Sequence, residues 1–198
     1  MKIQHMNYQA ATMPTYGRID LCFVKGDGCF LITDDNKRYL DCASGIAVNT
    51  LGHCHPRLIE VMHHQSKKLT LTSRALYNNK LGEFMETICN TFNYNKVLPM
   101  NTGVEGGETA IKIARKWGYE VKNVDSAVNL FCDNNFWGRT ITACSTSTDP
   151  SCYIDFGPFT KGFETVNYND INALEKKFYK NPYIVAYMME PIQGEAGV

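Results

Sequence analysis

The stretch Met100-Asn101-Thr102-Gly103-Val104-Glu105-Gly106-Gly107-Glu108-Thr109 decides how this sequence is interpreted. A short apolar run, Lys96–Pro99, precedes it and predicts a strand. Apolar residues follow it at helical spacing, at Ala110, Ile111, Ala114 and Trp117. They predict one face of a helix that begins directly after the glycine. The stretch is therefore a strand-to-helix turn.

The start of this helix has the features of an anion site. Thr102 suits the N-cap, and Glu105, three residues later, completes a capping-box pattern. Gly103 lets a ligand approach the backbone, and the first N–H groups of a helix carry partial positive charge. A phosphate is the natural ligand of such a site. An ordinary, well-capped turn is an equally good interpretation of these residues alone.

Downstream of this turn, apolar runs alternate with amphipathic stretches. The pattern predicts strands at Ala127–Cys132, Glu164–Asn167 and Tyr183–Met189, and helices from Arg139 and over Asp170–Phe178. The last strand is continuously apolar, which is typical of a parallel sheet covered on both faces. The sequence therefore predicts an α/β fold with a mostly parallel sheet flanked by helices.

Upstream of the turn, the pattern differs. Strand-like segments at Cys22–Lys25, Cys29–Thr33 and Arg38–Asp41 predict an antiparallel unit, with Asp34-Asp35-Asn36 as a hairpin turn. Two helices are expected next, from Pro56 to about Lys68 and from Leu81 to Phe92.

Three segments follow strands of the parallel sheet and should meet at one edge: Asn101–Val104, Asn134–Arg139 and Glu190–Glu195. Ligands in such sheets bind beyond the carboxyl ends of the strands. In the second segment, an aromatic ring could stack on a planar heterocycle, and Arg139 could hold a carboxylate through two hydrogen bonds. The alternative places Phe136 and Trp137 in the core and Arg139 on the surface.

The third segment holds two carboxylates at the end of a buried strand. A carboxylate there must be paired or hydrogen-bonded. We expect Glu190 to shape its loop through bonds to backbone N–H groups, and Glu195 to pair with an arginine or a substrate amine.

Composition excludes several classes of function. The chain has 198 residues, with 20 basic and 20 acidic side chains, so nothing in its charge favours a nucleic-acid or membrane partner. The N-terminus has neither a signal-peptide nor a transit-peptide pattern, which predicts a cytoplasmic protein.

The eight cysteines form no Cys-x-x-Cys pair and are expected to be reduced and mostly buried. His53-Cys54-His55 resembles a metal cluster only on paper, because neighbouring side chains point to opposite faces, and no metal is expected.

Six motifs, in order along the chain, resemble the ornithine aminotransferases, which are class III pyridoxal-phosphate-dependent aminotransferases of fold type I. They are Leu69–Tyr77, Val97–Tyr119, Asn135–Thr140, Ser145–Pro150, Phe156–Phe159 and Glu190–Val198. The resemblance extends over essentially the whole chain from Tyr16 on. It implies the first part of a fold type I aminotransferase, with pyridoxal 5'-phosphate as cofactor and a homodimer in the full-length protein. It also implies a division into residues 1–48, a hairpin segment of the small-domain region, and residues 49–198, the first part of the large cofactor-binding domain.

The resemblance assigns roles to individual residues. It places the cofactor phosphate at Thr102, Gly103 and Val104, with the backbone N–H groups of the last two as donors. Phe136 resembles the ring that stacks on the pyridine. The substrate-binding residues would be Tyr16, Arg139, which reads the α-carboxylate, and Glu195, which pairs with a distal arginine.

Two departures affect the substrate and the activity. Ser44–His53 and Met13–Arg18 resemble acetylornithine aminotransferases, and Gly45 stands where ornithine-specific enzymes tend to carry a tyrosine. The Schiff-base lysine, the aspartate at the pyridine nitrogen and the distal arginine of the family would lie beyond Val198, so this chain holds no catalytic residue of its own. The apolar last strand also lacks a neighbour, and we therefore expect a truncated chain that is inactive alone.

Three functions follow. The first is transfer of the δ-amino group of ornithine to 2-oxoglutarate, giving glutamate semialdehyde and glutamate, in the full-length form. The second is the same chemistry on acetylornithine, and the third is a catalytically inactive fragment. A Rossmann-type nucleotide binder is set aside, because no Gly-x-Gly-x-x-Gly follows a strand.

Overall fold

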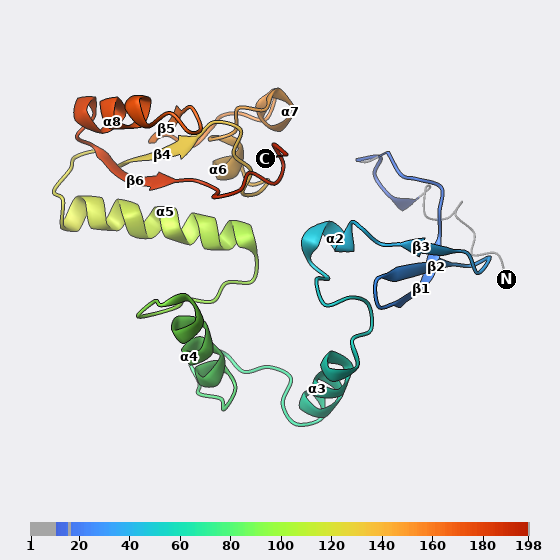
Figure 1. Ribbon diagram of the computed structural model, residues 1–198. Helices are drawn as coiled ribbons and strands as arrows, with labels where there is room; N and C mark the ends of the chain where they lie inside the picture. The colour runs from blue at the N-terminus through green and yellow to red at the C-terminus, as the bar shows by residue number, and fades with distance from the viewer. Residues whose placement is uncertain (1–10, 16, 198) are drawn as a thin grey trace. The chain divides into compact units, whose positions relative to one another are not determined.

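The computed structural model describes residues 11–15 and 17–197. These residues belong to two compact units, Met1–Phe84 and Met85–Val198. Figure 1 shows the helices and strands of each unit. The expected domain boundary between residues 48 and 49 rests on the resemblance and stays a prediction. The two compact units do not test it, because they describe contacts within this chain and not the domains of the family.

The first unit contains the expected antiparallel sheet. Strands β1 (Phe23–Asp27), β2 (Phe30–Thr33) and β3 (Arg38–Leu40) pair in the order β1-β2-β3. The turn between β2 and β3 is closed by the Thr33 N–H, which donates to Lys37 O at 3.0 Å. Asn36 takes a φ of 62° there, a left-handed conformation that asparagine tolerates well. The predicted hairpin is confirmed.

The helices that directly follow the antiparallel sheet have no buried residues. Helix α2 spans Ser44–Ala47, and its backbone is left-handed at Gly45 and Ile46, with φ of 64° and 63°. Helix α3 spans Pro56–Ser66 and starts on the expected proline, but none of its residues is buried. Helix α4 spans Leu81–Phe92, as the sequence predicts, and crosses the boundary between the two units.

The second unit contains the parallel sheet. Strands β4 (Val128–Cys132), β5 (Phe163–Val166) and β6 (Ile184–Met188) pair in the order β5-β4-β6, with both pairings parallel. The helices are α5 (Gly103–Glu120), α6 (Ile141–Cys144), α7 (Pro150–Tyr153) and α8 (Ile171–Lys180). Figure 1 shows α5 and α8 on opposite sides of the strands. The predicted α/β architecture is confirmed.

The core of this unit lies between the sheet and α8. Leu130, Val166 and Ile184 are buried together, and Ala173 and Leu174 of α8 pack against them. On the other side, α5 approaches β6 closely, since a Cβ on Gly118 would lie 2.4 Å from Val185 Cγ1. Small residues therefore let this helix lie close to the sheet.

The face of α5 that the sequence predicts is partly wrong. Ile111 is buried as expected, but Ala110 is exposed and Trp117 is 46% exposed. The buried positions are Gly107, Ile111 and Gly118. Hydrophobic patterning missed the two glycines, which are buried because their lack of a side chain allows close packing.

Two other expectations are wrong. Lys96–Pro99 is not a strand, although its position before α5 is as expected. A strand requires a backbone ladder, and no described strand pairs with this segment. The cysteines are all free, but only Cys132 is buried, because most of the others lie where the described chain has little core.

No helix in the described part of the chain is long and apolar enough to span a membrane.

Candidate functional site

The N-terminus of α5 begins the site, and its capping box is formed as predicted. Thr102 Oγ1 accepts from the Glu105 N–H at 3.2 Å, and Glu105 Oε2 accepts from the Thr102 N–H at 3.1 Å. A helix leaves its first four N–H groups without intrahelical acceptors. The box satisfies two of them, and the hydrogen bonds of the described residues give no acceptor to the other two, Gly103 and Val104. These are the two N–H groups that the resemblance assigns to a phosphate.

The space beside Gly103, where a side chain would begin, is open. Outside its own turn of helix, no heavy atom would lie within 4 Å of a Cβ on Gly103. A Cβ on Gly107, in contrast, would lie 2.6 Å from Trp137 Cε3. Gly107 is therefore needed for packing, and Gly103 leaves room for a ligand. The positive end of the α5 dipole points into this room.

The loop after β4 lies against this helix start. A Cβ on Gly138 would lie 2.3 Å from Val104 Cγ2, so the two segments touch through a glycine. Thr140 in the same loop donates from Oγ1 to Glu108 Oε1 at 2.9 Å, which adds a second link to α5. Two of the three segments thus meet as the sequence predicts, although Asn101–Val104 does not follow a strand.

Packing separates the two aromatic residues of this loop. Trp137 stacks on Phe131 with ring centroids 5.8 Å apart and donates from Nε1 to Thr146 Oγ1 at 2.8 Å. Trp137 is therefore a packing residue, as the core alternative held for it. Phe136 beside it is half-buried, which leaves part of its ring available to a ligand.

The loop after β6 completes the convergence. Glu190 Oε1 accepts from the Phe136 N–H at 2.9 Å, and the Nε2 of Gln193, 2% exposed, donates to Asp133 O at 2.8 Å. Tyr168, just after β5, donates from Oη to the carbonyls of Glu190 and Pro191. As expected, the Glu190 side chain bonds to a backbone N–H group, but this group lies in the loop after β4 and not in the loop of Glu190 itself.

The predicted substrate residues lie on the surface or outside the described residues. Arg139 is exposed and directly precedes Thr140, the N-cap of α6. Glu195 is exposed in the turn after β6. Tyr16 lies outside the described residues.

Sequence reasoning missed several residues at this edge: Glu108, Tyr168 and Gln193. Each bonds to a partner at least 22 residues away in sequence. Their only signal in the sequence is their place within or just after an expected element. That signal is weak, because most polar residues at such places are exposed.

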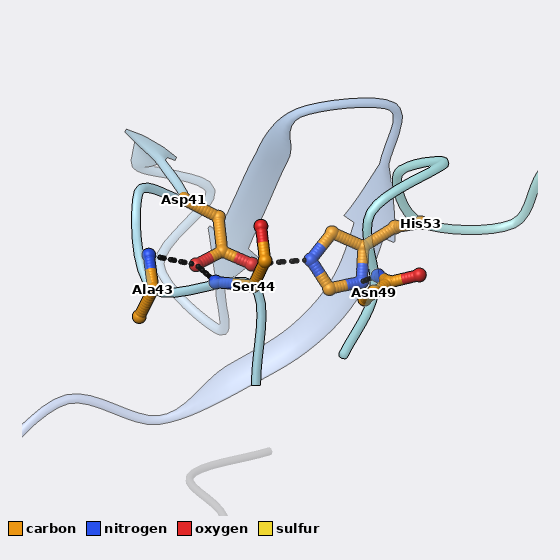
Figure 2. A network of polar contacts seen from close by, with 5 residues as sticks. All are labelled: Asp41, Ala43, Ser44, Asn49 and His53. Atoms are coloured by element: carbon orange, nitrogen blue, oxygen red, sulfur yellow. Dashed lines mark hydrogen bonds and ion pairs between the residues drawn. The ribbon is translucent and has the colours of Figure 1, made fainter. Parts of the chain in front are cut away.

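A second polar network lies in the first unit, and Figure 2 shows it. Asp41 Oδ1 accepts from the N–H groups of Ala43 and Ser44 at 3.1 and 2.9 Å. Its Oδ2 lies 2.7 Å from His53 Nε2, and His53 Nδ1 lies 3.0 Å from Asn49 Nδ2. With Asn49 donating to Nδ1, the histidine proton lies on Nε2 and points at the carboxylate.

This network holds the segment around α2. The bond from His53, followed by the Ser44 N–H, keeps the pKa of Asp41 below its ordinary value of 3.8. The left-handed backbone of α2 is unfavourable for Ile46. Asp41 accepts from the N–H groups of Ala43 and Ser44 at the start of α2, and Asn49, which bonds to His53, lies two residues after the end of α2. These bonds help to hold α2 in this conformation.

His53 is thus committed to a carboxylate and an amide. Among the described residues, no three His, Cys, Asp or Glu side chains are grouped so that they could hold a metal ion.

The described residues fit a phosphorylated, planar cofactor. Two N–H groups without an acceptor lie at the positive end of a helix, beside the open space at Gly103, and the backbone N–H of the half-buried Phe136 donates to Glu190. Both lie in the second unit, at the carboxyl edge of the parallel sheet.

Comparisons with known proteins agree with this geometry. The family profile "Aminotransferase class-III" matches residues 11–198. Mitochondrial ornithine aminotransferase of Rattus norvegicus is 53% identical over 185 residues, which are 92% of this chain and 42% of the relative. Ornithine aminotransferase of Vigna aconitifolia is 55% identical over 166 residues, or 83% of this chain and 39% of the relative.

Solved structures give the same result. Ornithine aminotransferase of Toxoplasma gondii superposes with a TM-score of 0.93 at 45% identity, covering 98% of this chain and 46% of that one. Acetylornithine aminotransferase of Elizabethkingia anophelis superposes with a TM-score of 0.81 at 37% identity, covering 98% and 45%. The chain therefore spans less than half the length of these relatives.

Proposed function

Because this chain belongs to the class III aminotransferases, a family that uses pyridoxal phosphate, we propose that it binds this cofactor at the N-terminus of α5. The observation that carries the proposal is the pair of N–H groups of Gly103 and Val104, which the capping box leaves without an acceptor, together with the open space beside Gly103. The family supplies the identity of the phosphate.

Each residue of the site then has a physical task. Gly103 and Val104 donate to the phosphate, and the helix dipole adds to their attraction. Phe136 covers one face of the pyridine ring, and Arg139 binds the α-carboxylate of the substrate through two parallel hydrogen bonds. When bound, the cofactor supplies an aldehyde that takes up the amino group and a ring that accepts negative charge from the substrate.

We propose that the full-length protein transfers the δ-amino group of ornithine to 2-oxoglutarate. Relatives named ornithine aminotransferase, at about half identity, support this choice of substrate. Glutamate semialdehyde and glutamate would be the products. Glu195 would pair with an arginine outside this chain, and two copies of the full-length chain would form a homodimer.

A second candidate is acetylornithine as the amino donor. Gly45, where ornithine-specific enzymes tend to carry a tyrosine, favours it, and so does the likeness to the enzyme of Elizabethkingia anophelis. A glycine leaves room for a larger donor than a tyrosine does.

One experiment tests both candidates. The full-length protein is titrated with pyridoxal 5'-phosphate, followed by absorbance, and kcat/KM is then measured for ornithine and for acetylornithine with 2-oxoglutarate. We expect stoichiometric cofactor binding and a preference for ornithine. A preference for acetylornithine would select the second candidate, and no cofactor binding would refute the proposal.

The cellular location stays a prediction. The expectation of a cytoplasmic protein stands beside relatives whose names place them in mitochondria. Imaging of the tagged full-length protein against a mitochondrial marker would decide between the two.

A further inference from the structure

One hydroxyl connects the two edge strands of the parallel sheet. Tyr168, two residues after β5, donates from Oη to Glu190 O at 3.2 Å and to Pro191 O at 3.0 Å. Both carbonyls follow β6, and β4 lies between the two strands. A hydroxyl has one proton, so the two carbonyls share it. The loop after β6 is thereby tied across the end of β4.

The same loop holds Phe136. The Glu190 side chain accepts from the Phe136 N–H at 2.9 Å, across 54 residues of sequence. A carboxylate binds a backbone N–H group about twice as strongly as a neutral acceptor does. This bond acts on the backbone from which the ring projects, and the direction of a side chain follows its backbone.

The neighbours of Phe136 are held separately. Asn135 donates from Nδ2 to the carbonyls of Cys132 and Thr146, both at 2.7 Å. Trp137 is held by its stack on Phe131 and its bond to Thr146. These contacts fix the loop as a whole, whereas the Glu190 bond acts at Phe136 itself.

We propose that Tyr168 and Glu190 are positioning residues that set the angle at which Phe136 meets the cofactor. This proposal rests on the proposed function, in which Phe136 stacks on the pyridine ring. Tyr168 holds the Glu190 backbone, and Glu190 holds the Phe136 backbone. Neither side chain is required to touch the cofactor.

The test uses the full-length holoenzyme with saturating pyridoxal 5'-phosphate and four variants. Tyr168→Phe removes the hydroxyl, Glu190→Ala removes the acceptor, and Glu190→Gln keeps a neutral acceptor oxygen. Tyr179→Phe, at a tyrosine of α8 that is 91% exposed, is the matched control. The readouts are the visible circular dichroism of the bound cofactor, kcat, KM and the melting temperature.

We expect Glu190→Ala to lower kcat about ten-fold and Tyr168→Phe about three-fold. Each variant loses one hydrogen bond that holds the ring in the orientation that favours the transition state over the bound substrate. Both should change the circular dichroism of the bound cofactor, with KM changed less than kcat. Glu190→Gln should recover most of the wild-type signal, and the control should match the wild type. In a fifth variant that combines Tyr168→Phe with Glu190→Ala, the losses should not add, because both residues act through the bond to the Phe136 N–H.

Two results would overturn the proposal. One is a lower melting temperature in Tyr168→Phe and Glu190→Ala with unchanged circular dichroism and kcat, which is the mark of a structural role alone. The other is a loss in Glu190→Gln as large as that in Glu190→Ala, which would point to the charge and not to the bond. Failure of the proposed function is distinct, since the wild-type protein would then show no cofactor signal at all.

Discussion

The side chain of Val104 occupies the space that a side chain on Gly138 would need. A Cβ on Gly138 would lie 2.3 Å from Val104 Cγ2. Val104 lies in the first turn of α5, and Gly138 lies in the loop after β4. Contact between the proposed phosphate site and the loop of the proposed stacking ring therefore depends on a residue without a side chain.

The first prediction follows from this contact. Gly138→Ala should lower the free energy of unfolding of the full-length protein by about 1–3 kcal/mol, the usual effect of overpacking, and weaken cofactor binding. Adding Val104→Ala should restore only part of the loss, because it removes Cγ2 but leaves the Val104 Cβ 2.6 Å from the added Cβ. The φ of 151° at Gly138 also stays unfavourable for alanine. Gly82→Ala, at a glycine with open space around it, is the control. If the double variant is no more stable than Gly138→Ala, contact with Val104 Cγ2 is not the cause.

The second prediction concerns the phosphate. Gly103→Val should leave the fold intact, since no heavy atom outside the same turn of helix lies within 4 Å of the added Cβ. It should nevertheless weaken binding of pyridoxal 5'-phosphate strongly, because the side chain enters the space above the N–H pair. Fluorescence titration of the full-length apoprotein measures this, with Gly103→Ala as the intermediate case. Wild-type affinity in Gly103→Val would place the phosphate elsewhere.

Local features of the site were predictable from the sequence, and long-range ones were not. The capping box joins Thr102 and Glu105, three residues apart, so the spacing alone encodes it. Convergence of the loops after β4 and β6 followed from the α/β pattern, whereas Asn101–Val104 joins them at the start of α5 without following a strand. The bond from Tyr168 to the loop after β6 depends on the order of the strands, which residue spacing does not reveal.

The errors have a related cause. The segment Lys96–Pro99 has the composition of a strand but no described partner strand, and pairing is a property of the fold and not of the segment. The buried face of α5 includes Gly107 and Gly118, which a search for apolar side chains cannot find.

The third prediction concerns Arg139. Arg139→Lys in the full-length enzyme should raise KM for both the amino-acid and the oxo-acid substrate, by roughly ten-fold or more, because a point charge does not replace a two-bond guanidinium contact. Steady-state kinetics with each substrate varied in turn measures this. Arg57→Lys, on α3, is a control for the same exchange at another exposed arginine. Normal KM values in Arg139→Lys would remove it from the carboxylate site.

The fourth prediction is a pH dependence of stability. The pKa of Asp41 lies below 3.8, chiefly because of the bond from His53, and the pKa of Glu164 lies below 4.5, chiefly because of the bond from Lys177. A carboxyl group with a lowered pKa stabilises the fold above its ordinary pKa, and this contribution is lost as the pH falls through the lowered value. Stability should therefore decline below about pH 4.5.

Denaturant unfolding of the full-length protein at a series of pH values checks this dependence. Asp41→Asn should be less stable at pH 7 and should lose less stability on acidification than the wild type. Asp34→Asn, at an exposed position in the hairpin turn, should follow the wild-type curve. An acid limb of unchanged slope in Asp41→Asn would remove this residue as its cause.

The fifth prediction concerns Gln193, which is 2% exposed and donates from Nε2 to Asp133 O at 2.8 Å. Gln193→Ala should lower the free energy of unfolding by about 1–3 kcal/mol, because the partly buried carbonyl of Asp133 loses its donor. Gln193→Glu should be worse at pH 7, since it places a carboxylate against that carbonyl oxygen. Burial would raise the pKa of the new carboxyl group in the fold, so this variant should regain stability as the pH falls.

Gln65→Glu is the matched control, since Gln65 makes the same kind of bond, from Nε2 to Leu69 O at 2.9 Å, in an exposed setting. Equal losses in Gln193→Glu and Gln65→Glu would show that burial at Gln193 has no part in holding the loop after β6.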